Sequence, residues 1–507
     1  MRPTTSLPLL AQCDRYRERT AIVDVKATFT YTELLQTSST VAAALLGGRE
    51  DLREERIAFA VTPGFAWVAT LWGIWRAGGV AVPLPLSSPT PELEYFIDDS
   101  GASTLVGDVL ALPLLSQFAR SRDIRALAYD ELCTCQAEHP HVGLNLGNER
   151  RAMILYTSGT SSRPKGVVTT HANVAAQIRS LVNAWEWSAE DRILLCLPLH
   201  HVHGIINVVS CALWAGATCQ MLPRFDANAV WDCIAGGNLT LFMAVPTIYT
   251  KLIATWDAAS AERREVLSRG CAGIRLMVSG SAALPVSTLL RWKEISGHTL
   301  LERYGMTEIG MALSNPLHGD RVPGSVGKPL PDVEVQLVAG DGKLVPPGTA
   351  GEIEVRGPGV FTEYWGQPEA TRSAFRDGWF RTGDTAVVEN GVYRILGRTS
   401  SDILKTGGHK VSALEIEEVL RQHPAVAECA VVGVPDAEWG ERVAAAVVLN
   451  ERQMLDLPSL RSWALKLLAV HKVPSRLLVL NALPRNAMGK VVKPSVVELF
   501  KDTGESD

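Results

Sequence analysis

Short apolar runs rich in β-branched residues alternate with longer helical patterns through the first three quarters of the chain. The runs at 152–156, 193–197, 241–245 and 275–278 have the length and composition of strands, whereas 173–185 has the period of a helix. Strands separated by helices form parallel sheets that helices cover. The sequence therefore predicts a fold of the α/β class with a large N-terminal domain of helix-covered sheets.

A β-rich portion and a second domain are predicted after this alternation. Pro- and Gly-rich stretches at 323–331 and 346–351 indicate turns that lead into the β-rich portion. The stretch at 399–402 is polar, as expected of a hinge. We therefore assign residues 1–398 to the large domain, 399–402 to the hinge and 403–507 to a small, mobile α+β C-terminal domain.

The small domain has helix and strand signals of its own. Ser412 and Glu415 have the spacing of a capping box that opens a helix. The runs 426–434 and 443–449 predict strands, and 459–470 predicts a further helix. A unit of about one hundred residues is a normal size for a small domain.

The charge and hydropathy patterns exclude two classes of partner. The chain has 49 basic and 54 acidic residues, so there is no basic excess to hold a nucleic-acid backbone. The uncharged stretch 204–223 contains several polar residues and two glycines, which makes it a poor membrane span. We expect a buried helix followed by a strand there. Nothing in the sequence predicts an oligomeric state.

The cysteines and the N-terminus bear on the compartment. No pair of the nine cysteines has the C-x-x-C spacing of a zinc or redox site, and their odd number indicates reduced thiols. No secretory signal is visible, and a strand pattern at 21–24 leaves little room for a transit peptide. We predict a cytoplasmic protein, or a mitochondrial one if a short targeting segment is present.

The loop at 156–166 is the most informative segment for function. It follows a predicted strand and combines Gly and hydroxyl residues with one lysine, Lys165. Backbone N–H groups, hydroxyl donors and a cation together suit a polyphosphate. A P-loop kinase is a poor match, because Gly166 stands where that motif needs Ser or Thr. On this segment alone, an ordinary flexible Ser/Thr loop is an equal alternative.

This loop resembles the signature of the adenylate-forming superfamily, which includes acyl-CoA synthetases, luciferases and peptide-synthetase adenylation domains. One departure is that Ser161 and Ser162 stand where Thr-Gly is usual. Six more segments resemble the family's motifs, in the family's order: an acyl-pocket motif at 197–204, an adenine-side turn at 279–284, the Tyr-Gly-x-Thr-Glu motif at 302–308, a ribose motif at 379–384, the hinge and its following loop at 397–408, and a lysine motif at 484–490. The runs 197–204 and 301–308 resemble most closely the malonyl-CoA synthetases of the acyl-CoA synthetase family member 3 type.

The resemblance implies an ATP site built from most of these motifs. The β- and γ-phosphates are expected to contact the loop at Thr157, Ser158, Gly159, Thr160 and Lys165. Tyr304 is expected to pack against adenine with Ser281 nearby, and Asp384 and Arg398 to bind the ribose. Thr307 donates to the α-phosphate or the acid, and Glu308 ligates Mg²⁺, a hard cation that favours carboxylate and phosphate oxygens.

The same resemblance implies two orientations of the small domain. In the first, Lys490 bridges the acid carboxylate and the α-phosphate, where negative charge grows in the transition state. In the second, Lys490 leaves, and the loop at 405–408 arrives to form the coenzyme A tunnel. Lys405 then acts in thioester formation, and Gly407 and Gly408 allow close approach of the pantetheine chain.

Arg303 carries the prediction of which acid is used. Many family members have a small residue before the Tyr-Gly motif, whereas this chain has Arg303. A buried carboxylate is costly unless it is paired, and Arg offers a bidentate partner. We therefore expect a small dicarboxylic acid, malonate or methylmalonate, with His201 and Ser281 as further donors. The alternative is that Arg303 pairs with a protein carboxylate such as Glu302.

Three other functions stay open at this point. A synthetase for monocarboxylic or aromatic acids would share every motif, but its substrate would have no second carboxylate for Arg303 to bind. A ligase that loads the pantetheine arm of a carrier protein would differ only in its acceptor. A catalytically inactive nucleotide-binding protein is disfavoured, because Glu308, Asp384, Arg398 and Lys490 are all present.

Overall fold

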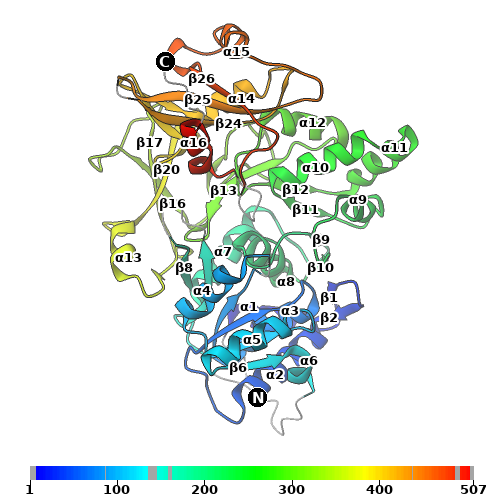
Figure 1. Ribbon diagram of the computed structural model, residues 1–507. Helices are drawn as coiled ribbons and strands as arrows, with labels where there is room; N and C mark the ends of the chain where they lie inside the picture. The colour runs from blue at the N-terminus through cyan, green and yellow to red at the C-terminus, as the bar shows by residue number, and fades with distance from the viewer. Residues whose placement is uncertain are drawn as a thin grey trace.

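Two large, mostly parallel sheets form most of the N-terminal part of the molecule (Figure 1). The computed structural model describes residues 7–85, 87–134, 146–157, 163–436, 438–485 and 491–502. The nine-stranded sheet has the order β15 (Lys328–Pro329), β14 (Gly310–Ser314), β13 (Leu301–Met306), β12 (Leu276–Ser279), β11 (Leu241–Ala244), β9 (Arg192–Leu195), β10 (Thr218–Met221), β1 (Thr20–Val23) and β2 (Thr28–Thr30). The seven-stranded sheet has the order β18 (Glu363–Tyr364), β8 (Lys165–Thr170), β7 (Arg151–Thr157), β4 (Val80–Pro83), β3 (Arg56–Ala60), β5 (Thr104–Gly107) and β6 (Arg125–Ala128).

Two smaller sheets follow in the chain. One is antiparallel and makes the predicted β-rich portion: β16 (Glu334–Val338), β17 (Gly351–Arg356), β20 (Trp379–Glu389) and β19 (Phe375–Arg376), with β21 (Val392–Arg398) paired to β20. The other lies in the orange C-terminal part of Figure 1: β23 (His409–Ser412), β22 (Ile403–Thr406), β25 (Gly440–Leu449) and β24 (Val426–Asp436), with β26 (Arg476–Val479) paired to β25. The α/β class with a smaller C-terminal α+β unit is thus confirmed.

Helices cover the sheets. In the large N-terminal part they are α1 (Pro8–Cys13), α2 (Tyr31–Leu46), α3 (Phe65–Arg76), α4 (Thr90–Ser100), α5 (Leu112–Arg122), α6 (Tyr129–Cys133), α7 (His171–Ala184), η2 (His203–Ser210), α8 (Cys211–Ala215), α9 (Ala227–Ala235), α10 (Pro246–Asp257), α11 (Ala261–Gly270), α12 (Val286–Ser296) and α13 (Pro368–Ala374), with single turns η1 (Asp14–Tyr16) and η3 (Cys271–Gly273). The C-terminal part has α14 (Ala413–Leu420), α15 (Leu457–Ala464), η4 (Val470–Lys472) and α16 (Lys493–Asp502). No helix in the described ranges is long and apolar enough to cross a membrane.

Helix α3 shows how the interior of the large N-terminal part is filled. Every residue of α3 except Ala66 is buried, including Trp67, Trp72 and Trp75. A helix that is apolar on all sides needs packing partners on all sides. The main hydrophobic core accordingly joins α3 to residues of both large sheets, such as Ile57 of β3 and Leu194 of β9.

The parallel strands place three of the motif segments at one edge of the nine-stranded sheet. Strands β9, β11, β12 and β13 are neighbours and run parallel. The motif segments 197–204, 280–284 and 307–308 each follow the carboxyl end of one of these strands. Ligands of open α/β sheets bind outside the carboxyl ends of the strands, so this edge is where a site is expected.

Two predicted helices differ from those observed. The helix expected at 459–470 ends at Ala464. After it, the N–H groups of Lys466 and Leu467 donate to the carbonyls three residues back instead of four, and Leu468 is buried. Packing therefore ended a helix that periodicity alone would have continued. The stretch 204–223 is a helix followed by strand β10, as predicted, but its first part, η2, is a π-helix, a rare form that is frequent at functional sites.

Candidate active site

Strand β13 and the turn after it carry four of the predicted site residues. Successive side chains of a strand point to opposite faces, so Glu302 and Arg303 diverge. Glu302 accepts a hydrogen bond from the Gly324 N–H at 3.1 Å, while Arg303 donates to Ser281. Thr307 and Glu308 lie in the turn between β13 and β14. Among the described residues Arg303 has no carboxylate partner, so the alternative pairing with Glu302 is not formed.

Tyr304, Asp384 and Arg398 form one connected group. The Tyr304 hydroxyl donates to Asp384 Oδ2 at 2.6 Å, and Arg398 Nε lies 3.0 Å from Asp384 Oδ1. Asp384 and Arg398 are register partners on β20 and β21, which explains why residues 14 positions apart meet. Burial and the neighbouring Asp384 raise the pKa of Tyr304 well above its usual value, so its hydroxyl stays a donor.

Glu308 and Lys165 both contact Tyr364, a residue that the sequence motifs did not indicate. The Tyr364 hydroxyl donates to Glu308 Oε1 at 3.0 Å, and Lys165 Nζ lies 4.8 Å from the centre of the Tyr364 ring. Glu308 is 5% exposed, burial raises its pKa, and its Oε2 has no hydrogen-bond partner among the described residues. A buried carboxylate oxygen without a partner is costly, and a cation would satisfy it.

The described ends of the loop at 156–166 lie on β7 and β8. Thr157 and Lys165 are register partners, which brings the two ends of the loop together. Directly before Lys165, the Pro164 carbonyl accepts a hydrogen bond from the Tyr95 hydroxyl at 2.8 Å. Ser158, Gly159 and Thr160 lie outside the described residues, so their predicted phosphate contacts stay predictions.

Arg303 is buried next to Ser281 and His203. Its Nη2 donates to Ser281 Oγ at 3.3 Å, and the same Oγ lies 3.3 Å from His203 Nδ1. Arg303 is 3% exposed, and burial lowers its pKa from 12.5 to about 9. Arg303 Nε and His203 Nε2 have no partner among the described residues. Within the described ranges, Arg303 is therefore a buried cation without a counter-ion, next to donors that are not used.

Backbone geometry shapes the surroundings of Arg303. Ser281 has φ +71°, a left-handed conformation that costs energy in a residue other than glycine and is common at functional sites. A Cβ on Gly280 would lie 2.6 Å from Arg303 Cζ, so only glycine leaves room for the guanidinium. The sequence predicted that His201, together with Ser281, donates to the acid bound by Arg303. The structure brings His203 into contact with Ser281, whereas His201 stacks edge to face on His200.

Sequence comparisons show the family to which the chain belongs. The AMP-binding enzyme family matches residues 9–365, and the AMP-binding enzyme C-terminal domain matches residues 415–490. The chain belongs to the AMP-binding enzyme family. This membership confirms the resemblance to the adenylate-forming superfamily. The mitochondrial malonate–CoA ligase ACSF3 of Mus musculus is 46% identical over 99% of this chain and 92% of that protein.

Solved structures of other AMP-binding enzymes show the same fold. ATP-bound MatB from Rhodopseudomonas palustris is 34% identical, with a TM-score of 0.90 over 99% of this chain and 100% of that chain. The apo form of the same protein gives a TM-score of 0.79 over all of both chains. The overall structure of this AMP-binding enzyme is therefore more similar to ATP-bound MatB than to apo MatB.

The residues predicted for coenzyme A lie in the C-terminal sheet. Gly407 (φ +53°) and Gly408 (φ +80°) form the two-residue turn between β22 and β23, a turn that needs positive φ at both positions. A Cβ on Gly407 would lie 2.8 Å from the Trp439 ring, and the Lys405 N–H donates to Glu441 at 2.6 Å. Their described contacts stay within this sheet, away from Glu308. Lys490 lies outside the described residues.

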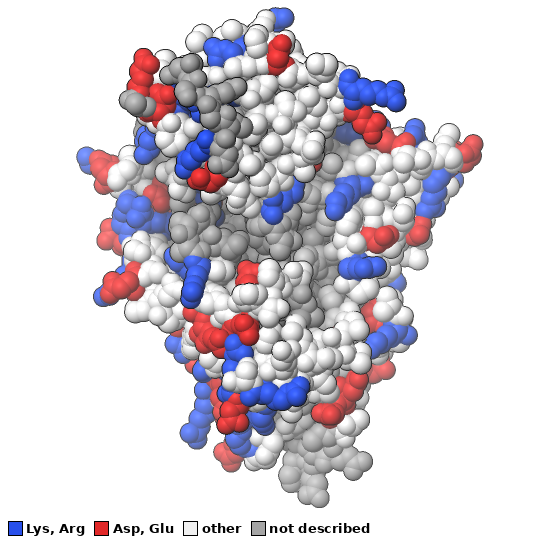
Figure 2. All heavy atoms as spheres, viewed as in Figure 1, with Lys and Arg blue, Asp and Glu red and all other residues white. Residues whose placement is uncertain are grey.

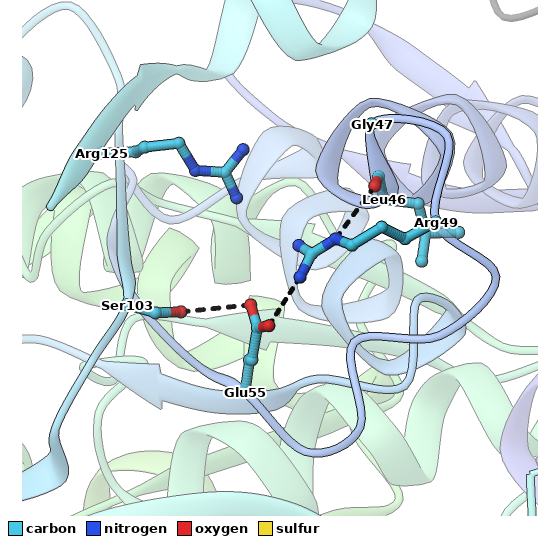
Figure 3. A pocket seen from close by; sticks show the side chains of 6 residues that line it. All are labelled: Leu46, Gly47, Arg49, Glu55, Ser103 and Arg125. Carbon is cyan, nitrogen blue, oxygen red and sulfur yellow. Dashed lines mark hydrogen bonds and ion pairs between the residues drawn. The ribbon is translucent and has the colours of Figure 1, made fainter.

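A separate hollow of about 360 Å³ lies near the edge strand β6 of the seven-stranded sheet (Figure 3). Arg49 and Glu55 pair across it at 2.6 Å, and the Ser103 hydroxyl donates to Glu55. None of its lining residues belongs to a family motif, so it is not part of the site.

Basic and acidic side chains are interspersed over the molecular face shown in Figure 2.

Replacing Gly280 by alanine should move Arg303 without unfolding the enzyme. The added Cβ would meet the far end of a flexible side chain, which can shift, and a displaced guanidinium would bind a carboxylate poorly. We expect KM for the acid substrate to rise about 10- to 100-fold, with KM for ATP nearly unchanged. Steady-state kinetics with each substrate varied in turn measures this. Gly340→Ala is the matched control, because nothing lies within 4 Å of a Cβ there; an equal rise for both variants would contradict the packing argument.

Glu302 should make stability fall with rising pH. Burial, opposed by the Gly324 hydrogen bond and assisted by the nearby Glu418 carboxylate, raises the pKa of Glu302 to about 8. At pH values between the ordinary pKa of a glutamate and about 8, Glu302 holds a proton in the folded state that it has lost in the unfolded state. The unfolding free energy therefore decreases over that interval, by at most about 1.4 kcal/mol per pH unit from this group.

Urea unfolding midpoints at several pH values test this. Glu302→Gln should flatten the fall toward pH 8, whereas Glu294→Gln, at an exposed carboxylate on α12, should leave the wild-type slope. The same slope in all three proteins would show that Glu302 does not titrate in this range.

Proposed function

We propose that this AMP-binding enzyme is a malonate–CoA ligase that forms malonyl-adenylate from malonate and ATP and transfers the malonyl group to coenzyme A. The observation that carries the proposal is Arg303, a buried guanidinium with no carboxylate partner among the described residues, one residue before Tyr304. A second substrate carboxylate supplies the missing counter-ion, and Ser281 and His203, which contacts Ser281, supply further donors. The name of the Mus musculus relative agrees with this assignment.

The first half-reaction joins two anions. An oxygen of the near carboxylate attacks the α-phosphorus of ATP, and the bond to the leaving pyrophosphate breaks. Thr157, Ser158, Gly159, Thr160 and Lys165 hold that pyrophosphate. Tyr304 packs against adenine, Asp384 and Arg398 bind the ribose, and Thr307 donates to the α-phosphate or the acid. Lys490 stabilises the charge that grows between the carboxylate and the α-phosphate.

Glu308 Oε2, which has no partner in the part of the chain that the structure describes, fits a magnesium ion, which is usually bound by one or two carboxylates together with substrate phosphates. When bound, the ion supplies positive charge to the phosphate oxygens. Tyr364 holds the other oxygen of Glu308, which fixes the direction in which Oε2 points.

The second half-reaction uses a different orientation of the small domain. Residues 1–398 form the large domain, and residues 403–507 turn about the hinge at 399–402. Lys405, Gly407 and Gly408 then line the tunnel of the pantetheine arm. The thiol of coenzyme A attacks the carbonyl carbon of the adenylate, AMP leaves, and the thiol proton is released. The location of the enzyme, cytoplasmic or mitochondrial, stays a prediction.

A substrate panel tests the proposal. Malonate, methylmalonate, succinate, acetate and butyrate are each supplied with ATP, Mg²⁺ and coenzyme A, and both pyrophosphate and CoA thioester are measured. We expect malonate to give the highest kcat/KM, with methylmalonate close to it, because one methyl group changes binding by only about 1–3 kcal/mol. A preference for acetate or butyrate would replace the proposal with a monocarboxylate ligase.

Two further outcomes of the panel are informative. Pyrophosphate release without CoA thioester, restored by a carrier protein, would show that the acceptor is a carrier-bound pantetheine. No pyrophosphate release with any acid would show an inactive nucleotide-binding protein.

A further inference from the structure

Lys493, the first residue of α16, lies buried between two carboxylates. Its Nζ lies 2.5 Å from Asp402 Oδ1 and 2.9 Å from Glu417 Oε1. The side chains of Lys493, Asp402 and Glu417 are only 13%, 12% and 5% exposed. Burial acts to lower the pKa of Lys493, but the two carboxylates outweigh it and raise the pKa above its ordinary value. Lys493 is therefore a cation held inside the protein by two anions.

Asp402 joins this cluster to the nucleotide side of the molecule. Its Oδ2 accepts a hydrogen bond from the Arg398 N–H at 2.9 Å, and its carbonyl accepts one from the Ala413 N–H at 2.7 Å. The Arg398 side chain in turn pairs with Asp384, to which Tyr304 donates. A continuous series of polar contacts thus runs from the predicted ribose group through the hinge to the start of α16.

The segment that contains Lys490 ends directly before α16. Residues on either side of it are fixed: Arg485 and Val491 form an antiparallel bridge, and the Val492 N–H donates to the Pro484 carbonyl at 2.9 Å. Lys493 follows Val492 immediately. Whatever holds Lys493 therefore also holds the base of that segment relative to the hinge.

We propose that Lys493 is a positioning residue of the adenylation half-reaction, which ties the base of the Lys490 segment to the hinge through Asp402 while Asp402 is bonded to Arg398. The inference rests on the proposed role of Lys490. It concerns only the first half-reaction, because Lys490 leaves the site before the second. Rotation of the small domain would separate Asp402 from the Arg398 N–H but would carry the ion pair with Lys493 along.

The test compares the two half-reactions in purified full-length variants. Acid-dependent exchange of pyrophosphate into ATP reports adenylation, and thioester formation from synthetic acyl-adenylate and coenzyme A reports the second step. Lys493→Met should lower exchange by about 10- to 100-fold and thioester formation by no more than about threefold. Lys493→Arg, which keeps the charge, should restore most of the exchange.

Two further variants keep the result interpretable. Lys472→Met removes another lysine of the same domain, paired with Glu415 at 2.6 Å, and should leave both half-reactions near the wild-type rates. The double variant Lys493→Met/Asp402→Asn leaves no unpaired charge at Asp402, so it should fold and lose no more exchange than Lys493→Met alone.

Equal losses in both half-reactions, or a loss that Lys472→Met shares, would overturn the inference and leave Lys493 as a general stabiliser of the domain. The ratio of the losses in the two half-reactions is measured with whichever acid the wild-type enzyme adenylates. A wrong acid therefore counts against the proposed function and not against the role of Lys493.

Discussion

Replacing Arg303 by methionine should remove malonate activity while making the free enzyme more stable. Without the guanidinium, the second carboxylate of malonate would be buried without a partner, which typically costs about 2–5 kcal/mol. That range corresponds to a fall in kcat/KM of roughly 30-fold to several thousand-fold. Steady-state kinetics with malonate and with butyrate measures the effect, and butyrate activity should change far less.

The stability gain follows from the same burial. Arg303 is 3% exposed, and burial lowers its pKa from 12.5 to about 9, which means that the folded state disfavours its charge. An apolar side chain of similar length should raise the unfolding free energy by about 1–3 kcal/mol, read from urea unfolding. Arg303→Lys is the control, since it keeps the charge but not the bidentate geometry. Equal kinetic losses for malonate and butyrate, with lower stability, would show that Arg303 is a structural residue.

Replacing Lys490 by alanine should strongly slow the first half-reaction and spare the second. The ammonium is proposed to stabilise charge that appears only in the adenylation transition state, where loss of one such donor costs about 10²- to 10³-fold. Malonate-dependent pyrophosphate exchange should fall by that factor, while thioester formation from synthetic malonyl-adenylate should stay near the wild-type rate.

The matched control for Lys490 is Lys501→Ala, a lysine on the exposed face of α16 that pairs with Glu498 at 2.7 Å. It should leave both half-reactions unchanged. Undiminished exchange in Lys490→Ala would remove this residue from the mechanism, and a parallel loss in the second half-reaction would indicate a damaged domain.

The sequence predicted those parts of the site that lie within one motif. Arg303, Tyr304 and Glu308 share a single run, and their motif was recognisable without a structure. Asp384 and Arg398 were assigned to the ribose, and their pairing on neighbouring strands gives a geometric reason for that assignment. In each case the residue type and its spacing within the motif were enough to make the prediction.

Contacts between distant segments could not be predicted in this way. Tyr364 meets Glu308 across 56 positions, and His203 meets Ser281 across 78. The partners of Lys493 are set by how the hinge packs against α14 and α16, for which no local pattern exists. The same limit applies to the fold: β-branched runs predicted the strands, whereas the π-helix η2 and the early end of α15 depend on tertiary packing.

The central claim is that a carboxylate oxygen of malonate attacks the α-phosphorus of ATP. Malonate labelled with ¹⁸O in its carboxylates tests this most directly, with AMP isolated after complete turnover with coenzyme A and analysed by mass spectrometry. The account predicts that each AMP contains one ¹⁸O atom, transferred when the thiol displaces AMP from the adenylate. Unlabelled AMP, or label found instead in inorganic phosphate, would contradict it.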